Sequence, residues 1–309
     1  MLCAMAAALV RSAQLHRTPS PHHGIGMACE ERTRCYWAIH LLQQLFGTTE
    51  SQDTFAVTLR YPRSPSMPPE AVLRDSYKPR DDDRHRSSFG ITTVLLRLGR
   101  PWSMAMRYVK TRGSGPSGHF PWHPDSQYSR TTASLMDLGL QLPLSHRYRS
   151  ISISLLNHQV LEEHRGYWAP WFTTRLLYHT TLCLLNHPLL ITLQIRKVQN
   201  VSEAFLQQTA STLTNHVSWC MHFIELMTSR RFMCPDPLIC YCVAVVATIE
   251  LQRSFLKLRE GGRKSRDNFE ECMKFIASME SHWGFAGRTV SILHSLSPAS
   301  TSGNADRGE

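Results

Sequence analysis

The side chains in this sequence with the greatest capacity for chemistry are its nine cysteines and sixteen histidines, which can ligate metals or act as acids, bases and nucleophiles. A structural zinc site takes its ligands from closely spaced Cys and His residues, most often from CxxC pairs. Cys29 and Cys35 have five residues between them, and Cys240 and Cys242 lie on different faces of a predicted helix. We therefore predict structural or incidental roles, and no metal ligation, for all nine cysteines: Cys3, Cys29, Cys35, Cys183, Cys220, Cys234, Cys240, Cys242 and Cys272.

Two pairs of histidines have positions that could suit a metal or an acid-base role. His119 and His123 have the four-residue spacing of ligands on one helix face, but the prolines between and after them interrupt any helix there. His179 and His187 lie within or at the end of a strongly apolar stretch, which favours hydrogen-bonded core or boundary roles. The sequence has no GxSxG elbow, HExxH motif or phosphate-binding P-loop. We assign no catalytic, cofactor-binding or metal-binding residue, and ligand-binding residues stay unassigned.

The segment 113–118, GSGPSG, matches the GxGxxG pattern of dinucleotide-binding loops. That loop requires a strand before it and a helix that begins at its end. Here the preceding residues have a helical pattern, and the following His119-Phe120-Pro121 cannot open a regular helix. We therefore interpret the segment as a flexible connector and predict no cofactor.

Composition and charge restrict the class of protein further. The net charge of +10 is compatible with an anionic partner but carries no information on fold. Twelve bases against five acids in residues 60–112 could contact phosphate nonspecifically, although a solvated face is favoured. An odd number of cysteines on apolar segments fits a reducing intracellular compartment better than a disulfide framework. The apolar run Leu238–Ile249 is shorter than the roughly 20 residues that span a bilayer, so we predict no membrane association.

Apolar residues recur every three or four positions over most of the sequence, which is the pattern of helices. The stretch Trp168–Leu190 is apolar over most of its circumference, which predicts a helix at the centre of a domain. Strand-like alternation and internal repeats are absent from the sequence, so the predicted fold class is all-α, with many helices. Helices are predicted at 29–46, 89–109 with a break or kink near Gly99 and Pro101, 131–140, 151–163, 170–186, 202–228, 238–258, 267–279 and 283–296. For the helix at 238–258, Asp236 and Pro237 predict the start, and Gly261-Gly262 predict the end.

One of these helices has a familiar sequence. Residues 176–190, LLYHTTLCLLNHPLL, resemble the central helix of the regulatory ("middle homology") domain of fungal zinc-cluster transcription factors. The segments SWCMHFIELM, VATIELQRSF and WGFAGRTVSIL then follow in the order typical of that family, and a proline-Trp-proline corner at 120–129 precedes a helix as it does there. The resemblance spans about residues 29–296.

A second resemblance lies at 29–46, where the family has an arginine-rich turn followed by an aromatic-Trp pair and a leucine run. The sequence departs from that pattern at Thr33, where a third arginine is usual, and at Gln43 and Gln44, where relatives often have an acid-base pair. An ion pair made by that dipeptide in relatives is therefore not expected here. The matching residues are Arg32, Arg34, Tyr36, Trp37, Leu41, Leu42 and Leu45.

The resemblance also predicts how the chain is organised. Family members have further helices before the one at 29–46, whereas here only poorly patterned residues stand before it. We therefore expect the apolar stripe around Tyr36, Trp37, Leu41 and Phe46 to lack a cover, as in a truncated domain. The expected parts are a disordered leader (1–28), a first domain helix (29–47), a flexible linker (48–88), a helical regulatory domain (89–296, best packed over 168–296) and a disordered tail (297–309).

The function that the resemblance implies is the regulatory region of a nuclear fungal transcription factor that controls metabolic or biosynthetic genes through ligand- or partner-dependent helical packing. The six-cysteine zinc cluster that reads DNA in that family is not in this sequence, so we expect DNA contact only through that module and no zinc here. Expected partners are a small-molecule effector, a transcriptional partner protein or a second copy of the chain. One alternative is a standalone helical interaction protein of the cytoplasm. An all-α enzyme is disfavoured, because no nucleophile-base constellation is visible.

Overall fold

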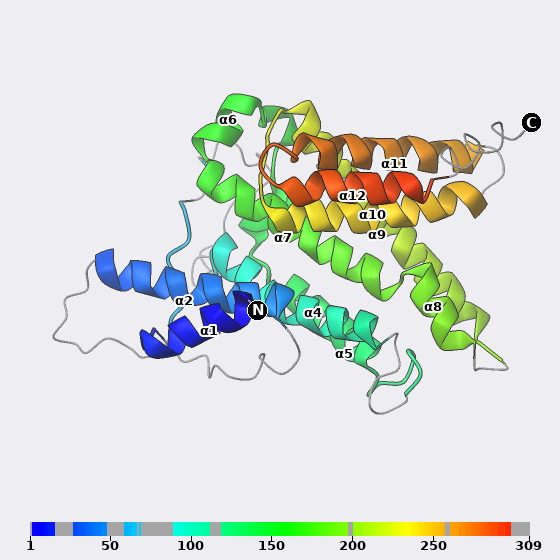
Figure 1. Ribbon diagram of the computed structural model, residues 1–309, viewed down its shortest axis with the longest axis horizontal. Coiled ribbons are helices and arrows are strands. Elements are labelled where there is room, and N and C mark those ends of the chain that lie inside the picture. Colours follow the sequence, from blue (N-terminus) through cyan, green and yellow to red (C-terminus); the bar gives the residue numbers. More distant parts are fainter. Residues whose placement is uncertain are drawn as a thin grey trace, which may run out of the picture. The chain divides into compact units, whose positions relative to one another are not determined.

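The computed structural model consists of α-helices and short 3-10 turns, with no β-strand in the part of the chain that it describes (Figure 1). The all-α fold class predicted from the sequence is therefore confirmed. The described residues are 2–15, 27–47, 59–66, 68, 89–111, 119–196, 200–256 and 260–297. The helices are α1 (Leu2–Ser12), α2 (Met27–Phe46), α4 (Ile91–Lys110), α5 (Gln127–Gln141), α6 (His158–Glu163), α7 (Arg165–Leu185), α8 (Pro188–Ile195), α9 (Glu203–Ser229), α10 (Pro237–Leu256), α11 (Glu260–Ser278) and α12 (Gly284–Ser295).

The chain divides into two compact units, Met1–Thr174 and Arg175–Glu309, and the division falls within α7. This organisation differs from the one expected from the sequence, in which the helix at 29–47 stands apart from a domain at 89–296. In the first unit α4 packs against both α2 and α5, so α2 is an integral part of that unit. In the second unit α11 packs against α9, α10 and α12.

Helix α1 occupies part of the segment for which the sequence predicts a disordered leader, and that prediction is wrong for Leu2–Ser12. Alanine is the strongest helix former, and Val10 of this helix is buried in one cluster with Tyr36 and Trp37 of α2. The guanidinium group of Arg32 donates hydrogen bonds to the carbonyl groups of the two residues that follow α1, Ala13 and Gln14. A cation at that position also complements the negative end of the helix dipole.

The prediction that the apolar stripe on α2 lacks a cover is wrong for its two largest side chains, Tyr36 and Trp37. Tyr36 is 1% exposed and Trp37 is 3% exposed, because α1 and α4 pack over them. Phe46 and Leu42, nearer the end of the helix, keep nearly half of their surface exposed at 47% and 46%. Covering helices therefore protect the middle of the stripe and leave its C-terminal end open.

Residues 59–66, within the expected flexible linker, lie against α2. The indole Nε1 of Trp37 donates a hydrogen bond to the carbonyl oxygen of Arg60 over 2.8 Å, and the backbone N–H of Arg63 donates to Glu30 Oε1 over the same distance. The Tyr61 ring stacks on Trp37 with a centroid separation of 4.5 Å. This short piece is therefore docked, and the rest of the expected linker, apart from Pro68, lies outside the described residues.

Helix α4 is one helix from Ile91 to Lys110, although the sequence predicts a break or kink near Gly99 and Pro101. Gly99 faces α2 at a point where an added Cβ atom would lie only 3.0 Å from the Gln44 side chain. The glycine is therefore explained by the close approach of two helices and not by a helix end. As a result, residues on both sides of Pro101 share one continuous helix face.

Other helix boundaries also differ from those expected. Residues 151–163 form a 3-10 turn and then the short helix α6, which begins after Asn157, whose side-chain oxygen accepts a hydrogen bond from Val160 N over 2.9 Å. The glycines at 261 and 262, expected to end a helix, belong to the first turn of α11.

The predicted start of α10 is confirmed, because Asp236 Oδ1 accepts from Leu238 N over 2.8 Å and Pro237 is the first helical residue. The expected tail after Ser297 lies outside the described residues.

Two helical segments are long and apolar enough to cross a membrane by length and composition, Arg165–Ile195 and Pro237–Phe255. More than half of the most apolar 18-residue window in each segment is buried, as is also usual for core helices of soluble proteins. On α10 the buried side chains include Ile239, Val243 and Val246, each with no exposed surface. These segments are therefore weak indicators of a membrane, and burial accounts for their composition.

Candidate functional site

A cavity of about 690 Å³ lies in the first unit, lined by α2, α4, α5 and the docked residue Tyr61. Each helix contributes residues that recur every three or four positions and therefore share one face. On α4 this face includes three arginines, so we call the site the arginine cavity. The residues that define it are Arg97, Arg100 and Arg107 of α4, His40 of α2, Asp137 of α5, and Tyr61.

The positive charge of the arginine cavity is only partly compensated. Asp137 is the only acid among the described residues that line the cavity, and it forms no ion pair or hydrogen bond there. Arg97 donates a hydrogen bond to Gln141 Oε1 and lies over the Phe89 ring, 4.9 Å from its centroid. Arg100 is exposed and forms no hydrogen bond or ion pair with the described residues. The cavity therefore attracts anions.

One wall of the cavity is aromatic. The Trp37 and Tyr61 rings are stacked at 4.5 Å, and the His40 ring meets Trp37 edge-on at 5.4 Å. Burial lowers the pKa of His40, so this imidazole is neutral near pH 7 and adds no charge. The serines that line the cavity, Ser103 and Ser134, form no hydrogen bond with His40. The arrangement is suited to binding and orienting an anion with an apolar part.

Of the histidines predicted from the sequence, His119 and His123 lie on an exposed loop before α5. Their rings stack face to face with a centroid separation of 4.1 Å, and Nδ1 of His123 accepts a hydrogen bond from the backbone N–H of Asp125 over 3.1 Å. No group of three or more His, Cys, Asp or Glu side chains suited to a metal ion occurs in the part of the chain that the structure describes. The segment 113–118 lies outside that part.

His179 and His187, for which the sequence predicts core or boundary roles, both form hydrogen bonds. Nδ1 of His187 accepts from Leu189 N over 3.3 Å at the start of α8. Nδ1 of His179 on α7 lies 2.7 Å from Nδ1 of His216 on α9, a partner that the sequence gave no reason to expect. Burial, and then the neighbouring His216 and Arg175, hold the pKa of His179 well below its ordinary value. Burial also lowers the pKa of His216 to about 4.

We expect this histidine pair to make the second unit less stable in acid. The folded state favours neutral rings, so the unfolded chain takes up protons first as the pH falls through about 6.5. The stabilisation is complete above that pH and is lost as the pH falls towards the pKa of His216, about 4. Between pH 7 and pH 4.5 the loss should be on the order of 2 kcal/mol, allowing for partial exposure of the ring.

The measurement is the urea midpoint of the wild-type chain and of His216→Gln at both pH values. The variant removes the titrating ring, so its stability should depend less on pH than that of the wild type. An equal loss in both proteins would show that other groups carry the acid sensitivity.

The cysteines lie mainly in the core of the second unit. Cys183 of α7, Cys220 of α9 and Cys242 of α10 meet near Thr180, whose hydroxyl oxygen is 3.7 Å from Cys220 Sγ. Burial raises the pKa of Cys183 and Cys242, so both stay protonated near neutral pH and behave as small apolar groups. The eight cysteines whose side chains are described are free thiols: Cys29, Cys35, Cys183, Cys220, Cys234, Cys240, Cys242 and Cys272.

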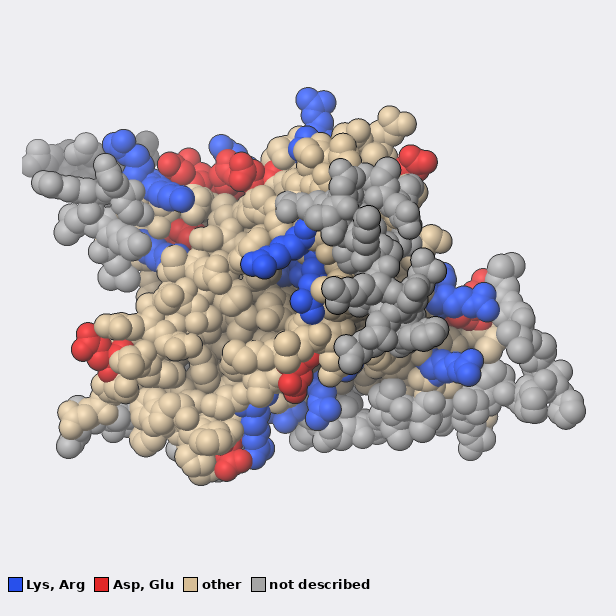
Figure 2. Space-filling view, turned by 180° about the vertical axis from the view of Figure 1, so that it is seen from behind, with Lys and Arg blue, Asp and Glu red and all other residues tan. Residues whose placement is uncertain are grey.

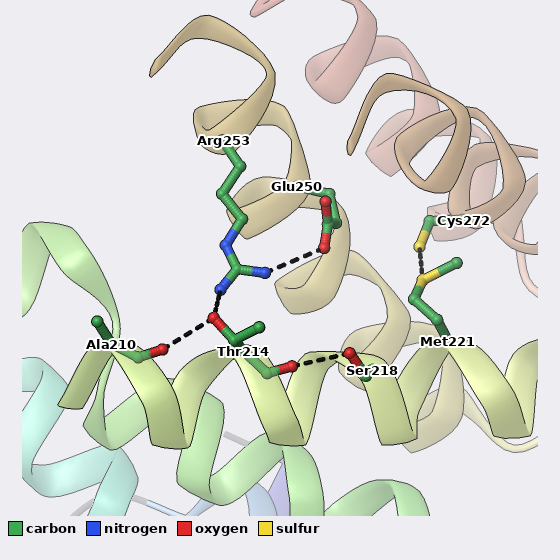
Figure 3. A network of polar contacts seen from close by, with 7 residues as sticks. All are labelled: Ala210, Thr214, Ser218, Met221, Glu250, Arg253 and Cys272. Carbon is green, nitrogen blue, oxygen red and sulfur yellow. Dashed lines mark hydrogen bonds and ion pairs between the residues drawn. The ribbon is translucent and has the colours of Figure 1, made fainter. Parts of the chain in front are cut away.

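A second polar cluster links α9 with α10 (Figure 3). Arg253 lies 3.4 Å from Glu250 Oε1 and donates a hydrogen bond to the Thr214 hydroxyl over 2.7 Å. Glu250 is 2% exposed, and its Oε2 atom has no hydrogen-bond partner. Beside it, the Cys272 thiol of α11 contacts the Met221 sulfur at 3.5 Å. The cluster joins the buried Glu250 to the exposed Thr214 through Arg253, so its contacts connect α10 with α9.

The exposed charges show no single dominant patch on the face in Figure 2. There, Lys and Arg lie singly or in small groups among Asp and Glu. A continuous basic stripe of the kind that follows a nucleic-acid backbone is not visible on that face. Among the residues coloured in Figure 2, this face therefore offers no extended basic surface as an alternative anion site.

No family model matches this chain, and comparison with curated proteins and with solved structures gives no match.

Proposed function

We propose that this chain is the regulatory region of a fungal zinc-cluster transcription factor, and that it acts in the nucleus on metabolic or biosynthetic genes. The resemblance of residues 29–46 and 176–190 to that family supports the proposal, and an all-α fold is consistent with it. In this proposal DNA is bound by a zinc-cluster module that is not among these residues, so the chain itself holds no zinc.

The observation that carries the proposal is that the segment 29–46, which resembles the family, forms part of the wall of the arginine cavity. Trp37 belongs to the aromatic-Trp pair of that segment, and it also forms the aromatic wall of the arginine cavity. A ligand that touches α2, α4 and α5 at once has more contacts when these helices are packed together. It would therefore shift the first unit towards the packed arrangement, which is how an effector can change the activity of a regulatory region.

A reporter assay tests this proposal. The full chain is placed between a heterologous DNA-binding domain and an acidic activation domain, and reporter output in yeast is measured at matched protein levels. The proposal predicts that the chain lowers output several-fold, because the regulatory region restrains activation. A fusion with an unrelated helical protein of equal length is the control for spacing. The same output from both fusions would overturn the proposal.

A second candidate is a cytoplasmic helical interaction protein, and the exposed apolar surface of α8 favours it. Leu189 and Leu193 of this helix are 58% and 41% exposed. Single exposed leucines are common on soluble proteins, so this surface is weaker support than the arginine cavity. In the reporter assay this candidate predicts no specific repression.

A further inference from the structure

Two arginines of the cavity are arranged to hold one carboxylate. Arg97 and Arg100 are three positions apart on α4, which places their Cβ atoms about 5–6 Å apart on the same face. Arg97 is held by its hydrogen bond to Gln141 and by the Phe89 ring. A guanidinium group has five N–H donors, so the contact with Gln141 leaves most of them for a ligand. Two guanidinium groups that face one cavity can bind a carboxylate through paired hydrogen bonds.

The rest of the cavity favours a ligand with an apolar body. Met104 lies between Arg100 and Arg107 along the α4 face, and the stacked Trp37 and Tyr61 rings line the same space. A volume of about 690 Å³ is within the range of small-molecule sites, about 300–1,000 Å³. A bare inorganic anion would make no apolar contact with the aromatic rings that line the cavity. A nucleic acid would need a charged surface much longer than this cavity.

We propose that the arginine cavity binds a small organic acid, whose carboxylate is held by Arg97 and Arg100 and whose apolar body packs against Tyr61 and Met104. The regulatory meaning of this site rests on the proposed function, whereas the binding itself does not. Asp137, the acid on the facing helix α5, disfavours a second negative charge on that side of the ligand. A monocarboxylate with one aromatic or long aliphatic body therefore fits best.

The test is calorimetric titration of the full chain with 2-naphthoate as the probe. We expect 2-naphthoate to bind and the uncharged 2-naphthamide to bind at least tenfold more weakly, because the amide lacks the anionic group. Inorganic phosphate should not compete with the probe at equal concentration. Arg100→Gln should raise the dissociation constant at least tenfold, and it should preserve the fold because Arg100 is exposed and has no partner in the described structure.

The matched control is Arg149→Gln, which removes the same charge from an exposed position outside the cavity in the same unit. This variant should bind within about twofold of the wild type, since screened charge at a distance contributes little. Equal affinity for acid and amide, equal loss in both variants, or displacement of the probe by phosphate or by a single-stranded oligonucleotide would overturn the proposal. Repression in the reporter assay without binding of the acid would overturn this ligand class and leave the regulatory function standing. Binding of the acid without repression would support this ligand class and overturn the regulatory function.

Discussion

Replacing Arg253 with alanine is expected to lower the free energy of unfolding of the second unit by about 3 kcal/mol, because it leaves a buried carboxylate without its cation. Glu250 is almost fully buried, and the Arg253 guanidinium group is its ion-pair partner at 3.4 Å. The same substitution removes the hydrogen bond to Thr214 on α9. Urea denaturation followed by circular dichroism measures the loss.

The double variant Glu250→Gln with Arg253→Ala separates the two contributions. Glutamine is neutral, so the double variant should recover much of the stability that Arg253→Ala alone loses. If the double variant is less stable than the single variant, the loss comes from packing of the arginine side chain and not from the unpaired carboxylate.

The second large effect is expected in the first unit, where Trp171→Ala should cost about 3–5 kcal/mol. The Trp171 side chain has no exposed surface, and its Nε1 atom donates a hydrogen bond to the carbonyl oxygen of His146 over 2.9 Å. Its ring also packs edge-on against Trp168 and Phe172, at 5.6 and 5.1 Å. The substitution therefore opens a large cavity and leaves a buried carbonyl group without this donor.

The matched control is Trp122→Ala, because Trp122 is 42% exposed on the loop before α5. This change should cost about 1 kcal/mol, since much of the Trp122 ring already lies in water and the substitution opens no enclosed cavity. Thermal and urea unfolding of both variants give the comparison. Similar losses at the two positions would contradict the core position of Trp171.

The sequence predicted the large helices well because their apolar faces have the helical period. The buried residues of α9 and α10 follow that pattern, and Asp236 with Pro237 marks the start of α10 as expected. Helix α1 was not predictable in this way, because a run of alanines has no polar face to define a stripe. Its docking depends on Arg32, a residue 18 positions from its partner Gln14.

The arginine cavity was missed for a reason that can be identified in the sequence. The sequence favours a solvated face for the bases of residues 60–112 and predicts a helix break or kink near Gly99 and Pro101. Because α4 is continuous, Arg97, Arg100 and Arg107 instead recur at helical spacing on one face. The spacing of these arginines in the sequence therefore indicates that they share one helix face. The facing residues of α2 and α5 come from distant parts of the chain, and only the fold brings them together.

Hydrogen exchange of the full chain with and without 2-naphthoate tests directly whether a bound acid controls the packing of the first unit. If an organic acid bound in the arginine cavity favours the packed arrangement, backbone amides of α2, α4 and α5 should exchange several-fold more slowly in its presence. The same acid should leave exchange unchanged in Arg100→Gln. Equal exchange rates with and without the acid, at concentrations that saturate the wild-type chain, would contradict the claim that the ligand controls the packing of these helices.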